Sequence, residues 1–195
     1  MKSTGSKIRK ILILTLTAVL VIGLYYFCSR KEKDNNDKIS ANDPYSVIVS
    51  RDLELNYPST PKAVVTFYSD ILQQIYLEEL KDDQVEALAK QARGLFDLEL
   101  LALNQYDAYM ANLHVEREVY SKAGRYISGY EVENGYNIEY LTYQGVDYAK
   151  VNTKYYVREG GNLIYTYHEY TLREDEDGKW RILFWELSNE SSMEE

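Results

Sequence analysis

Cysteine is almost missing from this chain of 195 residues, which holds a single one, Cys28, and only two histidines. One cysteine cannot form a disulfide within the chain, and no cysteine cluster is available to hold zinc. Neither His114 nor His168 has Asp, Glu or Cys at the spacing of a zinc site. The sequence also lacks a glycine-rich phosphate loop, a nucleophile elbow and a Ser-x-x-Lys motif. It therefore predicts no metal site and no cofactor.

Basic charge is scarce after the first 40 residues. Residues 1–40 hold eight of the 22 Lys and Arg and three of the 31 Asp and Glu, which leaves 14 basic and 28 acidic residues in positions 41–195. A body with a net charge of −14 repels the phosphates of nucleic acids and anionic lipid headgroups, so we expect no nucleic-acid partner. Cationic partners remain open, as does an acidic surface that serves only solubility.

The one long apolar run is Ile11–Cys28, eighteen residues without a charge or a proline. At about 1.5 Å per residue, a helix of this length covers about 27 Å, close to the roughly 30 Å hydrocarbon core of a bilayer. A cleaved signal peptide needs small residues before the cut, where this run has Tyr25, Tyr26 and Phe27. Phe27 also replaces the small residue that precedes a lipidated cysteine. We therefore expect a retained transmembrane helix, with a cleaved signal as the alternative.

Charges around this run predict its orientation. Four Lys or Arg precede it and three follow closely, so the positive-inside rule places the amino terminus in the cytoplasm and the body outside. The predicted protein is a single-pass signal-anchor protein of the cell membrane. Its parts are a basic tail (1–10), the transmembrane helix (11–28), a linker and lead-in (29–56), a folded domain (57–187) and an acidic tail (188–195). Within the lead-in, Val47–Val49 is apolar enough for a short extended or helical segment.

Helical patterns fill the first half of the expected domain. Thr60-Pro61 predicts a helix start, and apolar residues then recur every three or four positions through Tyr76. Asp83-x-x-Glu86 resembles a capping box that opens a second helix ending at Gly94. A short helical piece follows at 95–103, and a longer helix is expected at 105–122, stopped by Gly124.

After Gly124 the apolar pattern changes to strict alternation, which is typical of strands. We expect turns at Asn134-Gly135, Gln144-Gly145, Gly160-Gly161 and Asp177-Gly178. In the middle strand Ala149, Val151, Thr153, Tyr155 and Val157 share one face, which predicts a face for the core and a face for water. Helices followed by antiparallel strands indicate an α+β fold. The expected strands are 126–133, 136–143, 147–158, 163–174 and 179–187.

Several stretches resemble the nuclear-transport-factor-2-like, cystatin-related superfamily. They are the Thr60-Pro61 start with Val64-Val65-x-x-Tyr68, and the closing hairpin 170–182 with its acidic turn into Gly178-Lys179-Trp180. More narrowly, the chain resembles a family of small membrane-anchored bacterial proteins of unknown function. The resemblance covers about Asn56–Leu187 and the anchor. It implies a strongly curved antiparallel sheet that wraps a long helix into a cone, whose mouth holds a small ligand, a catalytic group or nothing. It also implies possible pairing of two copies through the open sheet face.

Individual residues offer few candidates for chemistry. His168 shares the helix-facing side of its strand with Tyr170, which predicts an imidazole in the cone lining, either as a catalytic acid or base or as a core residue. Tyr148 and Tyr156 alternate with lysines on the opposite face, a possible ligand-binding strip. Tyr170 is the third candidate for ligand binding. We expect Asp70 to be solvated.

Two functions of different class follow from these patterns. The preferred one is a membrane-anchored, extracytoplasmic and non-enzymatic domain that binds an envelope protein or a small ligand. The alternative is a small cone-pocket enzyme, of isomerase or hydrolase type, in which His168 and lining tyrosines act as acid or base. An enzyme requires a second polar group within hydrogen-bond reach of His168 and an open cavity beside it.

Overall fold

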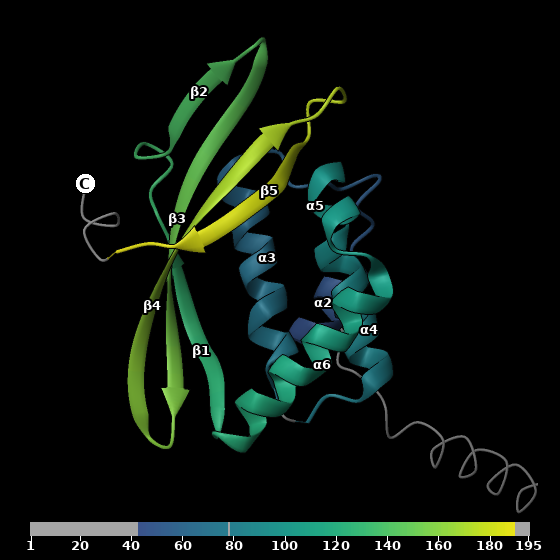
Figure 1. Cartoon of the computed structure of the whole chain (residues 1–195), viewed down its shortest axis with the longest axis vertical. Coiled ribbons are helices and arrows are strands. Elements are labelled where there is room, and N and C mark those ends of the chain that lie inside the picture. The colour runs from purple at the N-terminus through teal and green to yellow at the C-terminus, as the bar shows by residue number, and fades with distance from the viewer. Residues whose placement is uncertain (1–42, 78, 190–195) are drawn as a thin grey trace, which may run out of the picture. The chain divides into compact units, whose positions relative to one another are not determined.

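The computed structural model describes residues 43–77 and 79–189, and within them the fold is α+β, as the sequence predicts (Figure 1). The helices lie on one side of a five-stranded antiparallel sheet. The expected transmembrane helix Ile11–Cys28 lies outside these residues, as do the linker up to residue 42 and most of the acidic tail. Among the helices that the structure describes, none is long and apolar enough to cross a membrane.

Two capped helices begin the described part. α2 (Pro44–Val49) forms from the apolar lead-in, and the Asp43 carboxylate accepts a hydrogen bond from the backbone N–H of Ser46 at 3.2 Å. α3 (Pro61–Ile75) begins as expected, because the Thr60 hydroxyl accepts from the N–H of Ala63 at 3.1 Å. Such a cap satisfies an amide that has no partner inside the helix.

Three more helices follow. α4 (Asp82–Arg93) starts with a different cap from the expected one: the Gln84 side chain accepts from the N–H of Lys81 at 3.0 Å. Glu86, assigned to a capping box from sequence, instead pairs with Lys90 on the helix surface at 2.9 Å. Next come α5 (Leu98–Leu103) and α6 (Tyr106–Lys122), the latter followed by Gly124 with a positive φ of 58°. That conformation suits a glycine after a helix end.

The sheet contains β1 (Arg125–Val132), β2 (Glu139–Tyr143), β3 (Val146–Glu159), β4 (Asn162–Glu174) and β5 (Trp180–Leu187), in the order β1-β3-β4-β5. β2 pairs with the first half of β3, and β1 pairs with its second half along the same edge. The loop at Asn134-Gly135 therefore joins two strands that do not pair with each other. The expectation of a hairpin turn there was wrong, because β3 is long enough to carry two partners end to end.

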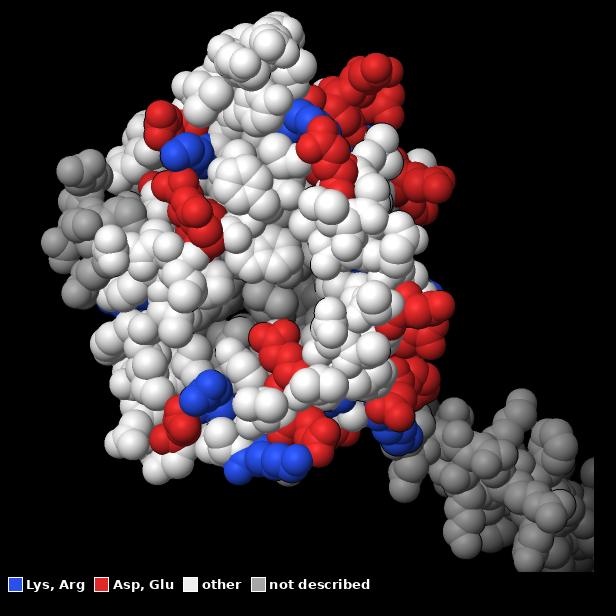
Figure 2. Space-filling model, viewed as in Figure 1, with Lys and Arg blue, Asp and Glu red and all other residues white. Residues whose placement is uncertain are grey.

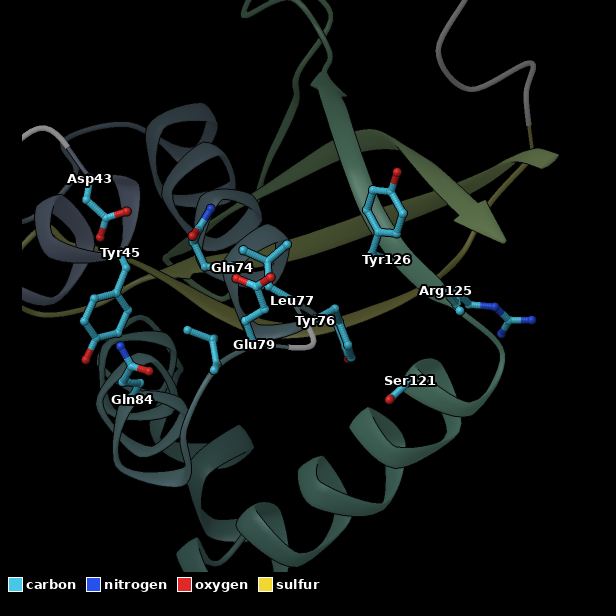
Figure 3. A pocket seen from close by; sticks show the side chains of 12 residues that line it. Asp43, Tyr45, Gln74, Tyr76, Leu77, Glu79, Gln84, Ser121, Arg125 and Tyr126 are labelled. Atoms are coloured by element: carbon cyan, nitrogen blue, oxygen red, sulfur yellow. The ribbon is translucent and has the colours of Figure 1, made fainter. Parts of the chain in front are cut away.

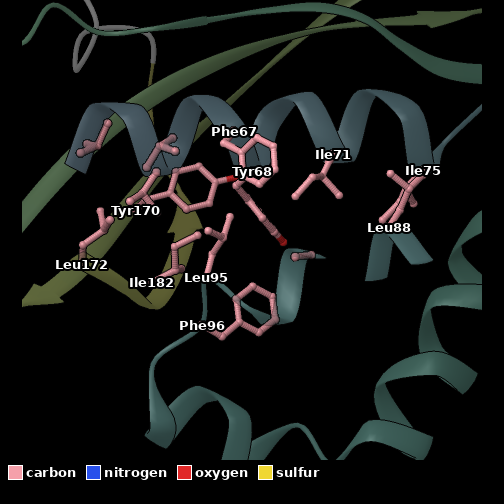
Figure 4. Packing of buried hydrophobic residues seen from close by; sticks show 14 of the residues in the cluster. Phe67, Tyr68, Ile71, Ile75, Leu88, Leu95, Phe96, Tyr170, Leu172 and Ile182 are labelled. Carbon is pink, nitrogen blue, oxygen red and sulfur yellow. The ribbon is translucent and has the colours of Figure 1, made fainter. Parts of the chain in front are cut away.

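Burial on β3 follows the predicted alternation, with Ala149, Val151, Thr153, Tyr155 and Val157 all buried. Their face lies against α3, which is buried along most of its length. Figure 4 shows Tyr68 of α3 beside Tyr170 and Leu95 in this core, with Ile71 further along the helix. The segment before α5 joins the sheet edge, because the N–H of Ile182 donates to the carbonyl of Leu95 at 2.9 Å. One continuous core therefore joins the helices to the sheet.

Candidate ligand pocket

A cavity of about 250 Å³ lies between α3, α6 and the helix-facing side of the sheet. Eight of the residues around it are Tyr, Trp or Phe, and they come from helices, strands and the loop before α5. Figure 2 shows the corresponding face of the molecule, hollowed near its middle, with uncharged side chains around the hollow and acidic ones at its rim. The aromatic lining residues are Tyr68, Tyr76, Phe96, Tyr109, Tyr120, Tyr155, Tyr170 and Trp185.

Buried hydroxyls behind the cavity form a short chain. The Ser69 hydroxyl of α3 lies 2.8 Å from the Tyr155 hydroxyl, which lies 2.8 Å from the Tyr170 hydroxyl. Burial raises the pKa of Tyr155 to about 12 and the pKa of Tyr170 well above its ordinary value. Both phenols are therefore neutral near pH 7, and their hydroxyls serve the core by satisfying one another.

Aromatic rings pack around the deep end of the cavity. The Tyr68 ring lies 5.7 Å from Tyr170, 5.8 Å from Phe96 and 5.9 Å from Trp185, measured between ring centroids. Nearer α6, Tyr76 stacks on Tyr120 at 4.3 Å. Such edge and offset contacts favour rigid ring positions. The cavity wall is therefore held in place by packing between elements.

His168 lies on the helix-facing side of β4 and lines the cavity, where the alternation of the strand predicted it. Its ring packs edge-on against Tyr155 at 5.2 Å and stacks with Tyr170 at 6.2 Å. Burial lowers the pKa of His168 below 6.5, so the imidazole is neutral at pH 7. Within the described part of the chain, Nδ1 has no hydrogen-bond partner. Acid or base catalysis by His168 requires a second polar group within hydrogen-bond reach of its ring, and Nδ1 has none.

Glu116 is the single charged residue among those that line the cavity, and sequence reasoning missed it. Its negative charge is one cause of the raised pKa values of Tyr76 and Tyr120, after burial. The spacing of Tyr109, Leu113, Glu116 and Tyr120 on α6 is that of one helix face. That spacing is a signal in the sequence, but only the tertiary structure shows that the face borders a cavity.

The outer face of the sheet holds the other tyrosine candidates, but it does not bring them together. Tyr156 packs against Tyr165 at 5.6 Å and donates its hydroxyl to Glu131 at 3.0 Å. The Lys154 ammonium lies 4.5 Å from the Tyr165 ring centroid. Tyr148 is eight positions away on β3, opposite Arg173. At about 3.3 Å per residue the two predicted partners are roughly 26 Å apart, so they do not form one strip.

Two polar features predicted from the sequence have structural roles. Asp70 was expected to be solvated, yet it is half-buried and accepts a hydrogen bond from the Tyr130 hydroxyl at 2.5 Å. Burial raises its pKa. In the acidic turn after β4, the Asp175 carboxylate accepts from the N–H of Lys179 and from the Arg181 side chain, each at 2.8 Å. In the described ranges no group of three or more His, Cys, Asp or Glu could hold a metal ion.

A wider hollow of about 660 Å³ lies near the start of the described part (Figure 3). Asp43, Tyr45 and Gln84 stand on one side of it, and Arg125 and Tyr126 stand on the other. It is more open than the aromatic cavity, and its polar side chains do not converge on a common point. We therefore regard the aromatic cavity as the candidate site.

A family model described as a domain of unknown function (DUF6715) matches residues 1–185. The chain belongs to this family. The match includes the apolar run near the amino terminus as well as the α+β body. A search of curated proteins finds no match.

Proposed function

We propose that the protein is a membrane-anchored, non-enzymatic domain that lies outside the cytoplasm and binds a small ligand in its aromatic cavity. The observation that carries this proposal is the cavity itself, which combines an apolar aromatic wall with few polar groups. Small-molecule sites in proteins have this character and are usually preformed. A volume of about 250 Å³ suits a ligand smaller than a typical drug.

The finer fold that we propose is the cone of the nuclear-transport-factor-2-like superfamily. Its support is the order of elements, with helices first and long strands afterwards, and the position of α3 against the inner face of the sheet. The outer sheet face then remains available for pairing with a second copy, and Tyr165 and Phe184 are exposed there. The fold alone does not identify an activity.

Membrane anchoring by Ile11–Cys28 is tested with the full chain produced in bacterial cells. We expect it in the membrane pellet after alkaline carbonate washing, because a hydrophobic span resists extraction that removes surface-bound proteins. A variant without residues 1–28 is the control and is expected in the supernatant. External protease should cleave the body of the full chain in cells whose outer layers are opened. Recovery of the full chain in the carbonate supernatant would contradict the anchor.

Occupation of the cavity is tested by the fluorescence of Trp185, which lines it. The chain has two tryptophans, so a Trp180→Phe variant leaves Trp185 as the only indole. Small neutral and charged aromatic or alkyl probes, including phenol and choline, are titrated into this variant. We expect at least one saturable change that a cavity-filling Thr166→Phe or Asn112→Phe substitution abolishes, since neither adds a second indole. A linear response to every probe would contradict a ligand site.

No specific observation favours the enzyme alternative. The Nδ1 atom of His168 has no partner in the described part of the chain, and the tyrosines closest to it have raised pKa values. A phenol with a raised pKa is a weaker acid near neutral pH, which lowers its value as a proton donor.

A further inference from the structure

The cavity is lined by one negative charge and by no positive one. Glu116 is its acidic residue, and neither Lys nor Arg is among the lining residues. Glu116 forms no ion pair with any basic residue that the structure describes, whereas Glu118 on the same helix pairs with Lys122 at 2.6 Å. The Glu116 carboxylate accepts a hydrogen bond from the Tyr76 hydroxyl, which is a neutral donor and does not cancel the charge. A carboxylate without a basic partner at the edge of an apolar cavity favours a positively charged occupant.

The basic side chains near the cavity, Arg93 and Arg117, interact with groups other than Glu116. The Arg93 guanidinium packs over the Tyr109 ring at 5.2 Å and donates to the carbonyl of Asn104 at 2.6 Å. Arg117, next to Glu116 in sequence, donates to the carbonyl of Ile75 at 2.8 Å. Because these cations are held by other groups and the Tyr76 hydroxyl that donates to Glu116 is neutral, the negative charge of Glu116 is not cancelled by a neighbouring base.

The aromatic wall adds to this preference. The faces of Tyr, Trp and Phe rings carry partial negative charge and attract cations, and cages of such rings are used by proteins that recognise quaternary ammonium groups. Rings from α3, α6, β3, β4 and β5 surround this cavity. Its tyrosines have raised pKa values and remain neutral phenols at pH 7, so the rings contribute through their faces. The −14 charge of residues 41–195 also raises the local concentration of cations.

We propose that the cavity binds a small organic ammonium ion, with Glu116 as its counter-ion at the mouth and the aromatic rings around the alkylammonium group. This inference rests on the proposed ligand-binding function and specifies the ligand class. An anion would be repelled by Glu116, because no basic residue lines the cavity. A neutral ligand would gain no charge interaction with Glu116.

Choline and its neutral isostere 3,3-dimethyl-1-butanol provide the test, because they have the same shape and differ in charge. Each is titrated calorimetrically into the full chain in a neutral detergent. We expect choline to bind at least tenfold more tightly than the alcohol. Glu116→Gln should weaken choline binding a few-fold, as expected for loss of an ion pair at an exposed mouth. Glu118→Gln, on the same helix and with the same change in net charge, should leave it unchanged.

A variant that is expected to bind choline more tightly is also needed, because weaker binding by Glu116→Gln could result from misfolding. Asn112 lines the cavity one turn before Glu116, so Asn112→Asp should tighten choline binding several-fold and leave the alcohol unaffected. Equal binding of choline and the alcohol would overturn the ammonium assignment and keep the ligand-binding function. Equal weakening by Glu116→Gln and Glu118→Gln would overturn it too, because the effect would then be general charge. If no probe binds, including phenol, both proposals fail.

Discussion

Among single residues, Tyr155 connects different parts of the cavity wall, because its hydroxyl forms hydrogen bonds with two other hydroxyls. It contacts Ser69 on α3 and Tyr170 on β4, each at 2.8 Å. Tyr155 itself is 2% exposed, so no bulk water replaces a lost partner. A buried hydroxyl without a partner costs about 1–3 kcal/mol. This residue therefore links the long helix to two strands.

We expect Tyr155→Phe to lower the free energy of unfolding by about 2 kcal/mol, since it leaves the hydroxyls of Ser69 and Tyr170 without their shared partner. Urea unfolding followed by circular dichroism measures this change. Tyr165→Phe is the matched control: its ring is 47% exposed on the outer sheet face, and its loss should be within about 0.5 kcal/mol. Equal effects of the two substitutions would show that the hydroxyl chain contributes nothing.

His168 gives a pH-dependent prediction. Its folded-state pKa lies below 6.5 because burial disfavours the imidazolium, so the unfolded chain binds more protons between that lowered pKa and 6.5. The contribution of His168 to the free energy of unfolding is therefore fully present above pH 6.5, and it is lost as the pH falls from 6.5 through the lowered pKa. Unfolding free energies at pH 7.5 and pH 5.5 should differ more for the natural chain than for His168→Gln. Equal differences for the natural chain and His168→Gln would contradict this role of His168.

At the scale of elements, an ion pair connects the start of α5 to β4. The Asp97 carboxylate caps α5 through the N–H of Glu99 at 2.9 Å and accepts two hydrogen bonds from Arg173, at 3.0 Å and 2.5 Å. Asp97 is 4% exposed. The same loop bonds to β5 through the N–H of Asp97 and the carbonyl of Ile182 at 2.8 Å. The pair thus fixes the loop that supplies Phe96 to the cavity.

We expect Arg173→Met to lower the free energy of unfolding by about 3 kcal/mol, because it leaves the buried Asp97 charge without its partner. Lys122→Met removes a pair of similar length that is largely exposed, and it should cost less than about 1 kcal/mol. Chemical unfolding of both variants measures the difference. A loss as small for Arg173→Met as for Lys122→Met would contradict a structural role for the buried pair.

At the scale of the whole molecule, the position of α2 bears on where the stable body begins. Ile48 of α2 belongs to the core, and the Gln91 side-chain amide donates to the carbonyls of Val49 at 3.2 Å and Arg51 at 3.0 Å. The Arg51 guanidinium lies over the Phe67 ring at 4.6 Å. These contacts join the lead-in to α3 and α4. The body therefore depends on residues before Tyr57.

A fragment of residues 57–195 should accordingly be less stable than one of residues 43–195. We expect a loss of about 3 kcal/mol, from the exposure of the apolar surface that Ile48 and its neighbours cover and from the loss of the two hydrogen bonds of Gln91. Urea midpoints of the two fragments, compared with Ile48→Ala in the longer one, measure the contribution. Equal midpoints would place the start of the stable body at residue 57, where the sequence pattern first suggests a domain.

Local signals in the sequence determined the elements. The Thr60 cap, the helix stop at Gly124 and the alternation on β3 all act over a few residues, so each could be interpreted without the rest of the chain. Composition likewise excluded disulfides within the chain. The position of His168 on the helix-facing side of β4 followed from the same alternation.

Tertiary structure alone decided the features that join distant segments. β1 and β2 share an edge of β3, Tyr130 reaches Asp70 across 60 positions, and Glu116 borders the aromatic cavity. Each of these contacts depends on which elements pack together, and a local sequence pattern does not indicate which distant segment will lie against it. The sequence by itself determined the helices and most of the strands, and the anchor at Ile11–Cys28 stays a prediction. The cavity and its charge arise from packing, because side chains far apart in the chain make its wall.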